Sequence, residues 1–405
     1  MAIQSGHARG TLVVVAMLCG LAAPAAARAP DAAPAGTGTT QTGGGPSPVP
    51  AAKAELLTAA TPDARDNEQG SDAAPEAASL SFVRGFADIG AAFSGDEGND
   101  GFGHGTLDLY FTPQLSEHVK ALGELVFEYN DLGELVVDLE RLQIGYAFSG
   151  GSTVWLGRFH TPLGYWNTAF HHGQQIQTAI SRPRFIDFED RGGVVPTHTV
   201  GVLATGGRST RGGRVRYDLF LGNSPTLVDG VLDPGNAGHQ KAEVSVGFNL
   251  SYRGRPGAPV ALGIHGYSSD VREDVRDSPV TRLRMFGGYV GLESDTWDIV
   301  AEYYAFHDRP SSGERDGNGS WAGFAQVGRR LGQWIPYGRL ERATFDSNSG
   351  YFGPQPGGQS YDRQALGLRR DLGSTAAIKA EALHTNERAS SRRFTGFQFQ
   401  WAVRF

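Results

Sequence analysis

Histidines, arginines and carboxylates gather in one part of the chain, between residues 158 and 198. Imidazole and carboxylate groups close together could form an acid–base pair, bind a metal ion or line a polar passage for charged solutes. The candidate site residues of this region are Arg158, His160, His171, His172, Arg182, Arg184, Asp187, Glu189, Asp190 and Arg191. Trp166 and Phe170 lie among them and could brace the segment against neighbouring structure.

Catalysis and metal binding are the less favoured uses of these residues. The groups that such chemistry would require are His160, His171, His172, His198, Glu189 and Asp190. Adjacent His171 and His172 would point to opposite sides of an extended chain, and no known catalytic motif surrounds them. Polar packing is the default for such histidines. The sequence therefore predicts no enzyme, no metal site and no cofactor.

Composition excludes several other classes of protein. The chain has 405 residues, one cysteine and a formal net charge of -7. A single cysteine, Cys19, cannot supply a disulfide scaffold or a cysteine-ligated metal site. Nucleic-acid binders usually carry a basic excess, so no nucleic-acid partner is expected. No window after the first 27 residues has the roughly 18 apolar residues of a membrane helix.

The beginning of the chain has two segments that precede the folded part. Residues 1–27 have basic residues, an apolar run and a small-residue ending, which predicts a cleaved secretory signal peptide. Lipidation of Cys19 is disfavoured because Leu18 precedes it. Residues 28–78 are rich in Ala, Pro and Gly with no apolar periodicity, which predicts a disordered periplasmic leader.

Residues 79–405 show apolar residues at every second position, the period of a strand. In the segment from Ala242 to Tyr252, Val244 and Val246 share one face while Glu243 and Ser245 share the other. Turn signals divide this region into about sixteen strands of roughly 9 to 13 residues, long enough to cross a bilayer when tilted. The predicted strands begin near Ser79, Thr106, Val119, Glu134, Thr153, His198, Gly213, Lys241, Ala258, Thr281, Thr296, Gly319, Trp334, Tyr361, Thr375 and Phe394.

Short and long connections alternate between these strands, with Asn130 to Gly133 as an exception. Outer-membrane barrels have short periplasmic turns and long external loops, and their strands must close to leave no open edge in lipid. The fold class predicted is all-β, a transmembrane antiparallel β-barrel. The segment from Glu134 to Phe148 breaks the pattern, because Asp138 and Glu140 share parity with Leu142. This break indicates a β-bulge or a register error.

Three short segments carry a family resemblance: Gly157 to Asn167, Pro336 to Glu341 and Lys379 to Glu381. The first is similar to a strand end and loop start, and the other two to late strands, of Gram-negative porins of the phosphate-selective porin O/P type. The resemblance implies a sixteen-stranded porin, often trimeric, with a constriction loop folded into the lumen. Phosphate specificity is not inferred for this chain, because residues 79–405 contain only three lysines.

The end of the chain resembles the signal that the barrel assembly machinery recognises. Its residues are Phe399, Trp401, Val403 and Phe405. The resemblance implies assembly in the outer membrane of a Gram-negative bacterium, in contact with its lipid.

A barrel of about sixteen strands is wide enough to hold an aqueous channel, so something must narrow it. The longest connection, Thr161 to Thr197, is the third external loop, and we expect it to fold inward with its charges at a pore constriction. Opposed charges there would set ion preference, or would pair with one another and hold the loop down. Strand parity predicts a nearly balanced lumen wall that includes Arg84, Asp88, Glu124, Glu128, Arg216, Arg282, Arg284, Glu302, Arg339 and Glu341.

The function predicted is passive diffusion of small hydrophilic solutes and ions through this channel. Arginine dominates the basic residues, and its guanidinium group binds carboxylate or phosphate at two points, which favours anionic or zwitterionic organic solutes. The alternative is a structural or adhesive barrel whose external loops bind a partner without transport.

Overall fold

The computed structural model describes residues 83–94, 100–129, 133–170, 173–233, 243–255, 259–274, 280–311 and 317–405. The chain divides into two units, Met1–Ser47 and Pro48–Phe405, and the first lies wholly outside the described residues. The predicted signal peptide (1–27) and leader (28–78) lie outside them too and stay predictions. In the described part, no helix has the length and apolar character needed to cross a membrane.

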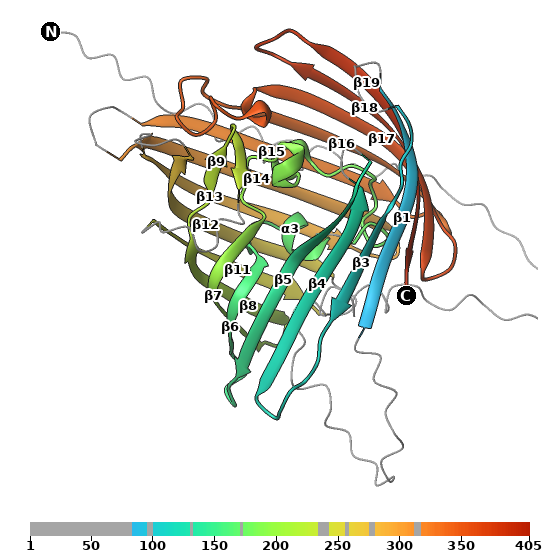
Figure 1. Cartoon of the computed structure of the whole chain (residues 1–405). Helices are drawn as coiled ribbons and strands as arrows, with labels where there is room; N and C mark the ends of the chain where they lie inside the picture. Colours follow the sequence, from blue (N-terminus) through green and yellow to red (C-terminus); the bar gives the residue numbers. More distant parts are fainter. Residues whose placement is uncertain are drawn as a thin grey trace, which may run out of the picture. The chain divides into compact units, whose positions relative to one another are not determined.

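Sixteen long strands form a closed antiparallel barrel in the described part of the chain (Figure 1). They are β1 (Val83–Ser94), β3 (Thr106–Phe111), β4 (Val119–Tyr129), β5 (Leu135–Ala147), β6 (Thr153–His160), β7 (His198–Ser209), β8 (Gly213–Asn223), β11 (Val244–Gly254), β12 (Val260–Glu273), β13 (Val280–Glu293), β14 (Trp297–Pro310), β15 (Asn318–Arg329), β16 (Trp334–Thr344), β17 (Tyr361–Asp371), β18 (Ala376–Glu387) and β19 (Arg393–Arg404). Three short strands lie in connections: β2 (Gly101–Phe102), β9 (Thr226–Val228) and β10 (Val231–Asp233).

The predicted barrel and its strand starts are confirmed. Thr106, Val119 and Tyr361 begin strands as expected, and the largest difference is four residues, Ser79 predicted against Val83 observed. Strand lengths vary more than expected, from 6 residues in β3 to 14 in β12. Turn residues mark strand ends well because they interrupt the alternating pattern.

The first and last strands close the barrel. β1 and β19 pair antiparallel from Phe86 with Arg404 to Ser94 with Gly396. At the end of the chain, the Gly85 amide donates to the Phe405 carbonyl at 2.9 Å, and the Phe405 amide donates to the Gly85 carbonyl at 3.0 Å. The sheet therefore has no open edge between these strands that would leave backbone groups unpaired.

The outer face of the barrel is an apolar belt. Exposed aliphatic and aromatic side chains follow successive strands, among them Ile89, Ile144, Leu156, Leu221, Ile264, Phe286, Leu340, Leu366, Phe397, Phe399 and Trp401. The residues between them point inward and include many buried charged groups. This alternation is typical of a barrel surrounded by lipid.

Two predicted lumen residues face outward instead. On β13 the buried residues are Thr281, Leu283 (0% exposed) and Met285, so Arg282 and Arg284 share the outer face with Phe286 (56% exposed). Arg282 binds Asp270 of β12 at 2.8 Å and 2.9 Å. The parity prediction was wrong because it assumed that charge marks the lumen, whereas the lumen at this height is filled with apolar side chains.

A β-bulge on β5 explains the break in the alternating pattern there. Glu124 of β4 is opposite Arg141 while the next residue, Leu125, is opposite Leu139, so Glu140 is an extra residue. Both Glu140 and Arg141 are buried, and outward-facing residues resume at Leu142. The bulge turns two successive charged side chains toward the lumen, which a regular strand cannot do.

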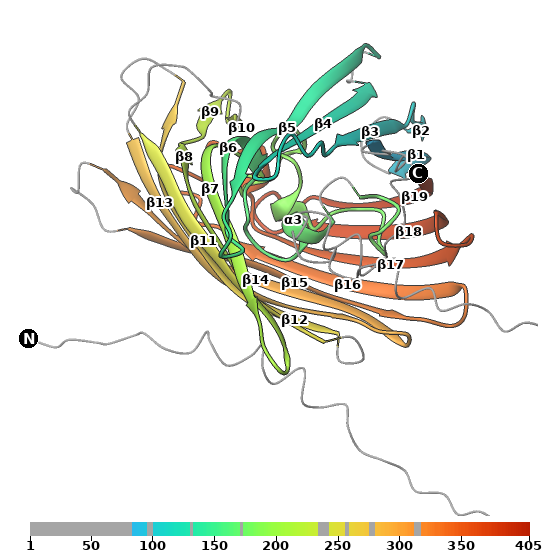
Figure 2. The same ribbon diagram turned by 90° about the horizontal axis from the view of Figure 1, so that it is seen from below.

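The connection from β6 to β7 folds into the lumen. It contains α3 (Trp166–Ala169) and the 3₁₀ turns η1 (Arg184–Ile186) and η2 (Glu189–Arg191). Figure 2, a view along the barrel, shows α3 surrounded by the strands. We call the residues 161–170 and 173–197 the inward loop.

An aromatic core joins the inward loop to one side of the wall. Trp166 and Phe185 are fully buried, and their rings pack edge-on against Phe324 (5.7 Å between centroids) and Tyr304 (5.2 Å) respectively. The Tyr351 hydroxyl, from the connection between β16 and β17, donates to the Val194 carbonyl at 2.7 Å. The loop is therefore a packed part of the core.

The apolar outer belt predicts that a charged side chain placed in the lipid should lower the free energy of unfolding. Leu366→Arg, in the middle of the outer face of β17, should lower the free energy of unfolding by about 2–4 kcal/mol, because arginine is costly at the centre of a bilayer. Leu331→Arg, in the turn between β15 and β16, should cost about 0–1 kcal/mol. Denaturant unfolding in phospholipid vesicles measures both. Equal costs would contradict a lipid-facing belt.

Candidate functional site

The inward loop meets β14 of the wall closely at its start. The Trp166 amide donates to Glu302 Oε1 at 2.6 Å, and the Tyr304 hydroxyl donates to Glu302 Oε2 at 3.0 Å. Gly164 has a φ of +74°, and a Cβ there would lie 2.1 Å from the Glu302 carboxylate and from the Tyr304 hydroxyl. Glycine is thus required here for both the turn and the close approach.

Wall carboxylates accept hydrogen bonds from the loop backbone. Glu381 of β18 accepts from the amides of Ile180 (3.3 Å) and Ser181 (3.1 Å). Glu341 of β16 accepts from the Arg184 amide at 2.8 Å. The amides of Ile180 and Ser181 lie in irregular chain and that of Arg184 begins η1, so none has a strand partner and the wall supplies their acceptors.

Wall cations donate to the loop carbonyls in the same way. Arg339 of β16 donates to the Ser181 carbonyl at 2.8 Å. Arg369 of β17 donates to two carbonyls, those of Gln175 and Gln177, at 2.7 Å each. Lys379 of β18 donates to the Ala179 carbonyl at 3.1 Å. All three cations are buried, and Arg339 also pairs with Glu341 at 2.8 Å.

Arg182 and Arg184, two predicted constriction residues, also help to hold the inward loop in place. Arg182 is buried, donates to the Ile186 carbonyl at 3.0 Å and stacks over the Phe188 ring. Burial lowers the pKa of Arg182 to about 10, so the group stays charged at neutral pH. Arg184 pairs with Glu387 of β18 at 2.7 Å. Both side chains hold the loop in its place.

The remaining loop candidates fall into three groups. Asp187 lies 3.9 Å from Arg182, and burial raises the pKa of its carboxyl. Arg191 is half exposed and forms an ion pair with Glu128 of β4 at 2.9 Å. His171 and His172 lie outside the described residues, as does the side chain of Asp190.

Four candidates, His160, His198, Glu189 and Arg158, meet at the root of the loop. His160, at the end of β6, lies opposite His198, at the start of β7, and 3.2 Å from Glu124. His198 contacts both Glu140 and Glu189. Arg158 is half buried on β6 and donates to the Glu140 carbonyl at 3.1 Å. The sequence placed the histidines in one neighbourhood, but Glu140 was not among the candidates.

The structure places most of the predicted wall residues on the lumen face. These are Arg84, Asp88, Glu124, Glu128, Arg216, Glu302, Arg339 and Glu341. Sequence reasoning missed Arg369 and Lys379. Lys379 shares strand parity with Glu381, a signal that could have found it.

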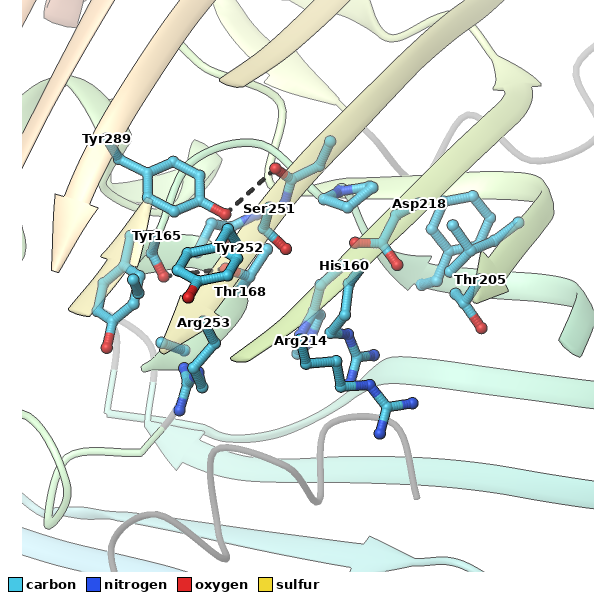
Figure 3. Close-up of a pocket in the computed structure, with 18 of the residues that line it drawn as sticks. His160, Tyr165, Thr168, Thr205, Arg214, Asp218, Ser251, Tyr252, Arg253 and Tyr289 are labelled. Carbon is cyan, nitrogen blue, oxygen red and sulfur yellow. Dashed lines mark hydrogen bonds between the residues drawn. The ribbon is translucent and has the colours of Figure 1, made fainter. Parts of the chain in front are cut away.

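One cavity beside the loop has mainly cationic groups among its charged lining residues. It has a volume of about 420 Å³ and lies near the short turns between β7 and β8 and between β11 and β12 (Figure 3). Its arginines are Arg141, Arg214, Arg216, Arg253 and Arg255. Among its described lining residues, Asp218 is the one carboxylate. In Figure 3, Arg214 and Arg253 lie on one side of the pocket, below Asp218 and Tyr289, and the Tyr289 hydroxyl donates to Asn249 Oδ1 at 3.2 Å.

A second cavity, of about 670 Å³, lies between the loop and the strands β1, β4 and β19. Its charges are nearly balanced, with four carboxylates against three guanidinium groups: Asp88, Asp100, Glu128 and Asp187 against Arg182, Arg191 and Arg363. Gln398 and Gln400 of β19 add neutral polar groups. The lumen thus has a cationic part and a part with charges of both signs.

Known solved structures share this fold. An anion-selective porin from Comamonas acidovorans has a TM-score of 0.55 at 13% identity, over 80% of this chain and 98% of that chain. The outer membrane channel DcaP of Acinetobacter baumannii has a TM-score of 0.52 at 9% identity, over 80% and 96%. The trimer form of OmpT, an outer membrane protein of Vibrio cholerae, has 0.52 at 10%, over 80% and 98%. The chain therefore has a porin-like barrel fold. No known family model and no curated protein matches it.

The anchoring of the loop can be tested at Arg339. Arg339→Met should release the loop from β16 and leave the buried Glu341 carboxylate without its ion-pair partner. The free energy of unfolding should fall by about 3–5 kcal/mol. Protease cleavage between residues 161 and 197 of the detergent-purified protein should become faster. The control is Arg342→Met, on the outer face of the same strand. Equal protection of the loop in both variants would show that Arg339 does not anchor it.

Proposed function

We propose that this protein is an outer-membrane porin, a water-filled channel for passive diffusion of small hydrophilic solutes and ions. The observation that carries the proposal is a closed barrel with an apolar outer belt and a polar interior, narrowed by an inward loop with a cavity on either side. An apolar belt suits lipid, and charged cavities suit solutes that lipid excludes.

The charge of the lumen favours anionic or zwitterionic organic solutes. Five arginines and one carboxylate line the smaller cavity. Arg141 pairs with Glu124, and the other four arginines still outnumber Asp218, so the wall would raise the local concentration of anions. In the larger cavity, carboxylates such as Asp88 and guanidinium groups such as Arg363 line the wall together and would orient a dipolar solute. The similar barrel from Comamonas acidovorans is described as anion-selective.

The wider setting of the proposal follows from the same fold. We infer residence in the outer membrane of a Gram-negative bacterium, with the 28–78 leader in the periplasm and a homotrimer as the assembly. The OmpT barrel of similar fold is described in a trimer form. Phe399, Trp401 and Phe405 are exposed on the outer face, where the barrel assembly machinery could bind them, and Val403 is half-buried beside them. Membership of the phosphate-selective porin O/P type and the absence of catalysis stay predictions.

Channel activity is tested by single-channel recording of the purified protein in a planar bilayer. Discrete open steps are expected, with a zero-current potential under a KCl gradient that has the sign of anion preference. Silence across many insertions of folded protein would contradict the porin proposal. That outcome would favour the alternative, a structural or adhesive barrel whose external loops bind a partner.

Selectivity is tested at the arginine-lined cavity. The double variant Arg253→Gln with Arg255→Gln removes two positive charges from its wall, so the zero-current potential should move toward cation preference. Arg342→Gln, which removes a charge from the outer face, is the control and should leave the potential unchanged. An unaltered potential in the double variant would show that this cavity does not set ion preference.

A further inference from the structure

Three side chains with metal-binding atoms meet at the root of the inward loop. Glu140 is the extra residue of the β5 bulge, His160 ends β6 and His198 begins β7. One ligand atom from each lies within 4.8 Å of the others, and the two imidazole rings are 5.5 Å apart. Three adjacent strands thus converge on one point, although the sequence predicted no metal site.

We propose that Glu140, His160 and His198 bind a divalent transition-metal ion, with Zn²⁺ as the best fit. Two imidazole nitrogens and one carboxylate oxygen form a familiar three-ligand set for zinc, with water as the fourth ligand. Ligand atoms must approach to about 2 Å from the ion, so small side-chain movements close the observed arrangement. The site stands independently of the channel function proposed above.

Each imidazole already has a second carboxylate that orients it. Glu189 Oε2 lies 3.3 Å from His198 Nδ1, and Glu124 Oε2 lies 3.2 Å from His160 Nε2. Glu189 is itself fixed by the Thr197 amide, which donates to Oε1 at 2.6 Å. Carboxylates that orient ligating histidines are a regular feature of zinc sites and strengthen metal binding.

The local charge also suits a divalent cation. The carboxylates that interact within this cluster are Glu124, Asp138, Glu140, Asp187 and Glu189, and the guanidinium groups are Arg141, Arg158, Arg182 and Arg191. The carboxylates outnumber the guanidinium groups by one. Buried charges are costly unless they are paired, so a bound cation would balance this excess.

Metal binding would act on the loop. In the ion-free arrangement His198 Nε2 contacts Glu140 directly. The ion would replace that contact with two coordination bonds, and the ring proton would leave to solvent. Glu189 and Thr197, near the end of the loop, contact His198 and would be fixed in position together with it. The ion would then clamp the loop root to three strands.

The test uses the full-length protein purified in detergent and stripped with EDTA. Calorimetric titration with ZnCl₂ alone should give one site per chain, and Co²⁺ should give the visible absorption of a tetrahedral nitrogen and oxygen site. His160→Ala with His198→Ala should abolish both signals. The matched control is His384→Ala, an imidazole on β18 that contacts Thr395. Equal zinc binding by the wild type and the double variant would overturn the proposal.

A second variant keeps the test informative if the double variant fails to fold. Glu189→Gln leaves all three ligands in place and removes the carboxylate beside His198. It should weaken zinc binding about 10- to 100-fold with unchanged stoichiometry. Unchanged affinity in this variant, or no zinc uptake by the folded wild type, would rule the site out.

Discussion

The structure depends on one constraint: the peptide groups of an irregular loop buried inside a barrel must find hydrogen-bond partners. The inward loop has little helix and no strand, so its local turns pair only some of its amides and carbonyls. The wall satisfies them with charged side chains, carboxylates such as Glu302 and Glu381 for the amides and cations such as Arg339 and Arg369 for the carbonyls. Charge–dipole hydrogen bonds of this kind are stronger than neutral ones.

This use of charge divides the lumen into two kinds of wall. On β14, β16 and β18, charged residues such as Glu302, Arg339 and Lys379 are buried and hold the loop, so their contribution to the potential in the cavities is small. On β8 and β11 the arginines line a cavity instead, where their field would act on the solutes of the proposed channel. Counting lumen charges without this distinction would describe a nearly neutral pore.

The bulge on β5 has effects well beyond that strand. One extra residue turns Glu140 and Arg141 inward together, and each then meets a partner at the loop root. Arg141 neutralises Glu124, while Glu140 joins His198. Without the bulge one of these two side chains would face lipid, where a charge is costly.

The sequence by itself determined the barrel, the strand starts and the inward position of residues such as Glu302 and Arg339, because alternation and turn signals are local properties of the chain. It misassigned Arg282 and Arg284, since their direction depends on what fills the lumen beside them. The partners of the loop, the convergence of Glu140 with His160 and His198, and the uneven spread of arginines were decided by tertiary structure alone. These contacts join residues that are distant in sequence, and strand periodicity has no information about which buried groups will meet.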